Sequence, residues 1–282
     1  MEAAGPGVDL LPAYATPLPV ETIARLLGVP VEDAPRLLDW SHRMVAIYQF
    51  DPTDEVRRDA DGAAAAFIAY LEEHIADRRR SPRDDLLGAM CTAADGDALL
   101  STAQIVSTAI LLLNAGHEAT VHQIGNAVAA ILAAEASGLR REAWLSDDDA
   151  VARTVEEAMR FDPPLHLFTR VATERIDWRD ADGVAVLIGR GEEIGLLLGA
   201  AGRDPRRFHS PDRFDPARRP VDHAAFGGGI HFCIGAPLAR LEMRIALRVL
   251  FGRLPALRIV GAPRRADAFH FHGFEALPVA WD

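Results

Sequence analysis

The stretch Phe226-Gly-Gly-Gly-Ile-His-Phe-Cys-Ile-Gly235 places Cys233 on a glycine-rich turn, just ahead of an amphipathic segment that begins near Pro237. Glycine lets the backbone turn tightly around the sulfur, and the amide hydrogens of such a turn stabilise negative charge. The N-terminal end of the helix predicted from Pro237 also favours a thiolate over a thiol. Three glycines at set positions are expected in only about 3 of 10,000 windows. The stretch therefore indicates a site that presents a thiolate.

Six residues of this stretch resemble the haem-binding signature of the cytochromes P-450, the haem-thiolate monooxygenases: Phe226, Gly227, Gly229, His231, Cys233 and Gly235. The resemblance implies that Cys233 is the thiolate ligand of a haem iron. The plain structural alternative is a buried cysteine in a glycine-rich loop. A zinc site is a weaker alternative still. Structural zinc usually takes four ligands at recognisable spacings, whereas His231 and Cys233 supply two and Cys91 is the only other cysteine.

Composition limits the class of protein. With 282 residues, of which 49% are hydrophobic, the chain can bury a substantial core, and we expect residues 1–282 to form one haem-binding domain. The net charge of −11 argues against non-specific binding of nucleic acid. Two cysteines make no disulfide framework and the N-terminus has no signal-peptide pattern, so we expect a cytoplasmic setting. The longest apolar run, Ala109 to Leu113, is too short to span a bilayer, so we expect no membrane anchor.

Most of the first 160 residues show helical patterns. Helices are predicted over 20–27, 32–48, 54–80, 84–93, from the capping box Ser101-Thr-Ala-Gln104 to about 135, over 147–160 and over 237–251, with a loop at Asp95-Gly-Asp97. Short strands are predicted over 169–174, 184–188 and 193–198, and an irregular strand over 276–280. The resemblance and this pattern together imply a mainly α-helical fold of the cytochrome P-450 type with a small β region.

Within the predicted central helix, Ala115-Gly116-His117-Glu118-Ala119-Thr120 puts a glycine and an acid into one turn. A glycine costs about 1 kcal/mol there relative to alanine, and its simplest reason is close approach of a flat ligand to the helix backbone. The alternative is an ordinary buried helix with a small-residue contact. The segment resembles the oxygen-activation element of the family, which implies contacts of Ala115 and Gly116 with haem and catalytic roles for Glu118 and Thr120. The family's threonine is Ala119 here, and Thr120 lies about 100° further around the helix, which leaves proton delivery in doubt.

Two further elements match the family. Glu157-Ala-Met-Arg160 places an acid and an arginine on one helical face, where a surface ion pair is the plain alternative. By resemblance, Arg213 completes a buried charge cluster with this pair that supports the cysteine loop. Arg170 and His231 are similar to the family's contacts with the haem propionates, and the forked guanidinium suits a carboxylate.

Several surface and loop segments are candidates for binding partners. The segments 165–169 and 271–277 are the expected substrate-facing loops. Six arginines lie just ahead of the cysteine loop: Arg203, Arg206, Arg207, Arg213, Arg218 and Arg219. The plain interpretation is a solvated basic face. Docking of an acidic redox partner is a hypothesis from charge alone.

The resemblance covers the chain from about Leu18 to the end. The early helices and strands of the family have no counterpart here, so we expect either a truncated sequence or a natural short form. The resemblance implies a monooxygenase that binds haem b, takes electrons from a ferredoxin- or flavodoxin-type donor and inserts one oxygen atom from dioxygen into a small apolar substrate. Two alternatives stay open: a non-catalytic haem-binding fragment or pseudoenzyme of the same family, and a helical interaction protein without haem.

Overall fold

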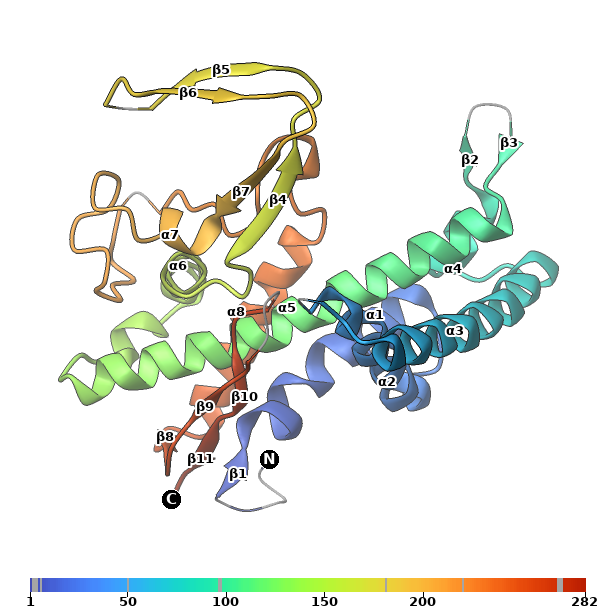
Figure 1. Ribbon diagram of the computed structural model, residues 1–282. Coiled ribbons are helices and arrows are strands. Elements are labelled where there is room, and N and C mark those ends of the chain that lie inside the picture. The colour runs from blue at the N-terminus through green and yellow to red at the C-terminus, as the bar shows by residue number, and fades with distance from the viewer. Residues whose placement is uncertain are drawn as a thin grey trace.

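One long helix, α5 (Thr102–Ala136), runs through the middle of the computed structural model, and the other helices pack around it (Figure 1). The model describes residues 1, 5, 7–49, 51–95, 98–180, 182–219, 221–267 and 271–282. The predicted capping box begins this helix: the Ser101 hydroxyl accepts from the Gln104 backbone amide at 3.2 Å, and the Gln104 side chain accepts from the Ser101 amide at 2.8 Å. These bonds satisfy two amides that a helix N-terminus otherwise leaves unpaired.

Four helices cover the N-terminal half of α5: α1 (Pro17–Leu27), α2 (Ala34–Val45), α3 (Asp54–Arg80) and α4 (Leu86–Thr92). Helix α1 ends at Gly28, whose φ of 84° is the left-handed conformation that favours glycine at this position. The helices bury a common apolar core that includes Leu27, Leu37, Phe67, Leu71, Leu87 and Ile105. The helices predicted in this part of the chain therefore pack through their apolar residues.

Two helices pack against the C-terminal half of α5: α6 (Asp148–Phe161) and α8 (Ala236–Arg253). Their shared core includes Ile124, Val128, Val155, Met243, Ala246 and Leu247. The short helix α7 (Leu198–Ala201) directly follows the strand Glu193–Leu197. Single turns of 3₁₀-helix lie at Val31–Asp33, Ala46–Tyr48, Arg141–Trp144 and Gly229–His231, and a π-helical turn lies at Leu11–Ala15.

The strands form small antiparallel sheets. Strand β4 (Leu167–Val171) pairs with β7 (Glu193–Leu197), and β5 (Ile176–Arg179) pairs with β6 (Ala185–Ile188). Near the two termini, β1 (Val8–Asp9), β11 (Pro278–Ala280) and β8 (Arg258–Ile259) form one sheet (Figure 1). The remaining pairs are β9 (Arg264–Arg265) with β10 (Phe274–Ala276), and β2 (Ala94–Asp95) with β3 (Ala98–Leu99). The predicted mainly α-helical fold with a small β region is confirmed.

Some predicted boundaries differ from the structure. The segment predicted as one helix over 32–48 is the helix α2 with a 3₁₀ turn at each end. Strand β5 was not predicted, and the predicted loop at 95–97 includes residues 96 and 97, which lie outside the described residues. Among the described residues, none of the helices combines the length and apolar character that a bilayer crossing requires.

Candidate functional site

Cys233 lies between the 3₁₀ turn Gly229–His231 and the first turn of α8. Its backbone amide donates to the carbonyl of Phe226 at 3.0 Å, which closes the turn. Gly227 and Gly229 have φ values of 69° and 66°, in the left-handed region that glycine adopts without strain. A Cβ added at Gly235 would lie 3.8 Å from the Cys233 sulfur. The glycines thus hold the turn around a half-buried, free thiol.

Packing behind the turn fixes its position. Phe226 is buried against Met159 of α6 and Ala236 of α8, with Cys233 packed at the edge of this group. The Arg240 guanidinium lies 4.6 Å from the Phe226 ring centroid and pairs with Glu156 at 2.7 Å. The pKa of Arg240 is raised first by its hydrogen bond to Glu156, with a smaller contribution from the charge of Cys233. Arg240 on α8 therefore joins this helix to Glu156 on α6, directly behind the cysteine turn.

Glu156 anchors this arrangement from α6. It accepts hydrogen bonds from Arg240 and lies 3.2 Å from the Nε2 atom of His223. Burial raises the pKa of Glu156, but the hydrogen bonds with His223 and Arg240 outweigh burial and lower the pKa to about 2. The carboxylate is charged at neutral pH and keeps Arg240 in place.

The surroundings of the thiol fit an apolar group that takes one sulfur ligand. Three apolar side chains flank the sulfur in sequence and are unusually exposed: Ile230 at 97%, Phe232 at 50% and Ile234 at 88%. In the described part of the chain, Cys233 belongs to no group of three or more metal-ligating side chains. The donor set is one thiolate, as a haem iron takes, whereas structural zinc needs four ligands.

The two predicted propionate contacts, His231 and Arg170, lie on different elements. His231 is exposed on the 3₁₀ turn that leads into the cysteine loop. Arg170 is half-buried on β4, donates to the carbonyl of Thr169 at 2.8 Å and lies over the Phe168 ring at 5.9 Å. Both side chains are accessible for binding a carboxylate.

Helix α5 is continuous through the segment Ala115–Thr120. A Cβ added at Gly116 would lie 3.2 Å from the Ile23 Cδ1 atom of α1. The glycine therefore allows close packing of α1 on α5, which is the small-residue contact that the sequence left open, and Ala115 is exposed. Thr120 is buried, and its hydroxyl lies 3.5 Å from the Gly116 carbonyl, at the limit of a hydrogen bond.

Glu118 is buried in a ring of histidines. Its Oε1 atom lies 2.9 Å from the Nε2 atom of His42 on α2 and 3.4 Å from the Nε2 atom of His117, and its Oε2 atom lies 3.7 Å from the Nε2 atom of His122. Burial raises the pKa of Glu118, but the contacts with His117 and His42 lower it by a larger amount. The pKa of Glu118 therefore lies well below its usual value. Glu118, His42 and His122 line a cavity of about 720 Å³ between α1, α2 and α5.

The buried charge cluster on α6 differs from the prediction in one residue. Glu157 and Arg160 form two parallel hydrogen bonds of 2.7 Å and are both fully buried, so the pair is not a surface ion pair. The second arginine at Glu157 is Arg218, at 3.3 Å, and the prediction of Arg213 is wrong. Arg213 is exposed and contributes only its carbonyl oxygen, which accepts from Arg160 and Arg218.

The predicted substrate-facing segments come together. The His272 amide donates to the Pro164 carbonyl at 2.8 Å, and the rings of His166 and His272 stack at 3.9 Å. Phe271 stacks on His122 of α5 at 5.7 Å. The two segments therefore meet next to the helix that carries Glu118.

The arginine-rich surface is largely neutralised by its own acids. Four of its guanidiniums pair with carboxylates in the following contacts: Arg203 with Asp212, Arg206 with Asp204, Arg207 with Asp222 and Arg218 with Glu157. The surface carries less net positive charge than its sequence indicates, which weakens the docking hypothesis.

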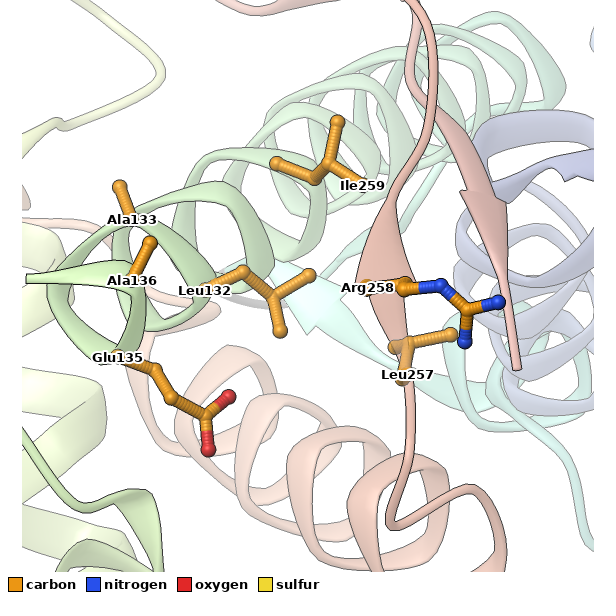
Figure 2. Close-up of a pocket in the computed structure, with 7 residues that line it drawn as sticks. All are labelled: Leu132, Ala133, Glu135, Ala136, Leu257, Arg258 and Ile259. Atoms are coloured by element: carbon orange, nitrogen blue, oxygen red, sulfur yellow. The ribbon is translucent and has the colours of Figure 1, made fainter. Parts of the chain in front are cut away.

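A second cavity, of about 340 Å³, lies at the C-terminal end of α5 (Figure 2). Leu132 points from α5 toward β8, and the Arg258 side chain extends away from the helix. None of the predicted site residues lines this cavity. It is therefore separate from the candidate site.

Sequence reasoning missed His42, His122 and Arg218. His122 lies four residues after Glu118, one helical turn away, so its spacing was a usable signal. His42 and Arg218 come from segments 76 and 61 residues away from their partners, and no local pattern marks such pairs.

A helical fold in which a glycine turn presents one thiolate, at the N-terminus of a helix packed against a long central helix, defines the class of haem-thiolate proteins. Comparisons with known proteins agree. The family model of the cytochromes P-450 matches residues 150–254. The biotin biosynthesis cytochrome P-450 of Bacillus subtilis (strain 168) is 35% identical over 98% of this chain and 68% of the relative. The mycinamicin IV hydroxylase/epoxidase of Micromonospora griseorubida is 37% identical over 100% of this chain and 69% of the relative.

A crystal structure of P450BioI in complex with an acyl carrier protein ligated to hexadec-9Z-enoic acid has a TM-score of 0.88 and 36% identity, over 98% of this chain and 69% of that one. The chain belongs to the cytochrome P-450 family, whose members hold haem through a cysteine thiolate. It spans about two thirds of the length of these relatives.

Proposed function

We propose that the protein is a haem-thiolate monooxygenase that inserts one oxygen atom from dioxygen into a small apolar organic substrate. The second oxygen atom leaves as water, with two electrons from a redox partner and two protons from solvent. The observation that carries this proposal is the cysteine turn, in which a half-buried thiol stands at the start of α8 beside exposed apolar side chains. Bound haem supplies the chemistry of reducing and cleaving dioxygen.

The residues of this chain would hold haem b from three sides. Cys233 would provide the thiolate ligand, and Phe226, Gly227 and Gly235 keep its turn in shape. Arg170 and His231 are proposed to bind the two propionates, since both are accessible and a guanidinium binds a carboxylate through two parallel hydrogen bonds. Ala115, exposed on α5, and Gly116 are proposed to contact the bound haem.

Proton delivery is assigned to Glu118 and Thr120. Glu118 lies between His42, which is half exposed, and the buried His117, so solvent can reach the carboxylate through an imidazole. A histidine is well suited to pass protons near neutral pH. Thr120 offers the nearest hydroxyl after Ala119 in sequence.

The substrate is proposed to enter between segments 165–169 and 271–277, which meet beside α5. Walls of leucine, valine and proline line much of the neighbouring cavity and favour an apolar molecule. The acyl carrier protein complex of the solved relative, with its hexadecenoic acid, is consistent with an apolar substrate. A ferredoxin- or flavodoxin-type donor and a cytoplasmic setting complete the proposal; the two free thiols support a reducing compartment.

Matched serine substitutions test the haem ligand. Cys233→Ser should abolish the thiolate-type absorption band of the reduced, carbon monoxide-bound protein, because a hydroxyl does not replace the thiolate ligand. Cys91→Ser changes the other cysteine, which is buried on α4, and should leave the band intact. Well-folded protein supplied with haem that shows no such band would refute the proposal. Turnover supported by peroxide and by a redox partner then separates a monooxygenase from a non-catalytic haem-binding member of the family.

A further inference from the structure

The histidines around Glu118 form a second group of potential metal ligands, separate from Cys233. The donor atoms of His42, His117 and Glu118 all lie within 4.8 Å of one another. Zinc bonds of about 2.0 to 2.1 Å in a tetrahedron place neighbouring donors about 3.3 Å apart. The measured separations of 2.9 and 3.4 Å from Glu118 to the two histidines are close to that value.

The contacts of His117 leave one of its buried ring nitrogens without a hydrogen-bond partner. Its Nδ1 atom lies 2.8 Å from the Leu113 carbonyl, which can only accept, so Nδ1 carries the hydrogen. The Nε2 atom of the same ring is buried without a hydrogen-bond partner and lies 3.4 Å from the Oε1 atom of Glu118. A metal ion between these two buried atoms would bind both of them and leave neither without a partner.

The same contact with Leu113 is the support that metal-binding histidines usually have. Such a histidine donates its other ring hydrogen to a carbonyl or carboxylate, which fixes the ring and leaves the second nitrogen for the metal. Here His117 comes from α5 and His42 comes from α2, so the ligands connect two helices. The side chain of His42 is 54% exposed and opens into the 720 Å³ cavity, which offers an entry path and room for a water ligand.

We propose that His42, His117 and Glu118 bind a divalent transition ion of the zinc class, with one coordination position left for water. Two imidazoles and a carboxylate are a common zinc ligand set. His122 lies 3.7 Å from the other oxygen of Glu118 and steadies the carboxylate. If Glu118 delivers protons as proposed above, an ion bound to it blocks that role, so the site is inhibitory.

A second histidine group is a poorer candidate. Asp162, His166 and His272 also lie within 4.8 Å of one another. Arg265, however, lies 3.0 Å from the Asp162 carboxylate and already supplies a positive charge there. A cation would have to bind next to that guanidinium, which is unfavourable.

Zinc binding to the haem-loaded protein tests the site, because the haem iron then occupies the Cys233 thiolate. Equilibrium dialysis with metal analysis should find one tightly bound zinc per chain. His42→Gln and His117→Gln should each weaken zinc binding by at least about tenfold. His209→Gln, which changes an exposed histidine outside both groups, should bind zinc as the parent does. His42 is half exposed, so its variant should fold even if the variant of the buried His117 does not.

Three results would overturn the site: no zinc bound, binding that His42→Gln leaves unchanged, or binding that is lost in His272→Gln instead. Zinc should also inhibit product formation by the parent protein, and less in His42→Gln. Zinc that binds through His42 without any inhibition would leave the metal site standing and would refute the role of Glu118 in proton delivery. The two proposals therefore fail in distinguishable ways.

Discussion

At the residue scale, Glu242 of α8 makes stability depend on pH. It is 6% exposed, and burial raises its pKa to about 7, although the hydroxyl of Thr22 opposes the shift. The folded protein therefore binds a proton at Glu242 that the unfolded chain releases near its ordinary pKa of about 4.3. Between about pH 4.3 and about pH 7 the folded state binds more protons than the unfolded state. The contribution of Glu242 to the free energy of unfolding therefore falls as pH rises through this range, and it is constant above about pH 7.

Glu242→Gln should remove this dependence, because the amide stays neutral. We expect its free energy of unfolding at pH 8 to exceed that of the parent by roughly 1 to 3 kcal/mol, with little difference at pH 4.5. Urea denaturation at the two pH values measures this, and Glu193→Gln, at an exposed position on β7, serves as the matched control. An equal gain at both pH values would show that burial of charge is not the cause.

Ala119 is the position where a single hydroxyl could change the reaction. Ala119→Thr adds one at the position of the family's threonine, on a half-buried part of α5. If proton delivery is impaired, the variant should yield more product per electron consumed, measured as product formed against reductant oxidised. Thr120→Val is the companion variant, which removes the neighbouring hydroxyl. An unchanged yield of product per electron in Ala119→Thr, together with a lower yield in Thr120→Val, would show that Thr120 already takes part in proton delivery.

The sequence could predict those site residues whose chemistry is local. Cys233 stands in a turn whose glycines and helix start are all within ten residues, and Glu157 and Arg160 are one helical turn apart. Glu118 was also predicted, but its neighbour His42 was not, because tertiary packing of α2 on α5 brings the two together. The family resemblance indicates Arg213, whereas packing of the loop on α6 places Arg218 at Glu157, and no local pattern distinguishes the two arginines.

At the element scale, the buried charges of Glu157, Arg160 and Arg218 join α6 to the loop that precedes the cysteine turn. Arg218→Ala should lower the free energy of unfolding by about 3 kcal/mol, because it removes one of two guanidiniums from a fully buried carboxylate. Arg213→Ala should change the free energy of unfolding by less than about 0.5 kcal/mol, because that residue contributes only a backbone carbonyl. Denaturant unfolding of both variants measures the difference. Equal losses would contradict the assignment of Arg218 to the cluster.

Helices were predicted more completely than strands, for physical reasons. The ends of α5 and α6 have side-chain caps within three residues, at Ser101 and Asp147, so their signals are short-range. Strand β5 is exposed along its whole length, so it lacks the alternation of buried and exposed residues that marks a strand. Strands β1 and β11 pair across almost the entire chain, which no local pattern specifies.

At the scale of the whole molecule, haem should bind the folded chain and not the unfolded one, and so stabilise it. Ile230 and Ile234 are the most exposed apolar side chains next to Cys233, and a bound porphyrin would cover apolar surface that water otherwise contacts. A ligand at about 100 times its dissociation constant contributes about 2.7 kcal/mol to the free energy of unfolding. In a chain of 282 residues that corresponds to a rise in Tm of about 5 °C.

Thermal unfolding of the protein before and after removal of haem should therefore show the higher Tm in the haem-loaded form. The rise should be smaller in Cys233→Ser, which keeps the apolar contacts and loses the bond from sulfur to iron, and unchanged in Cys91→Ser. The difference between the two serine variants measures what the thiolate adds to folding, apart from hydrophobic contact with the ring. Equal rises in both would mean that haem binds this surface without Cys233, and the thiolate could then not be the feature that holds the cofactor.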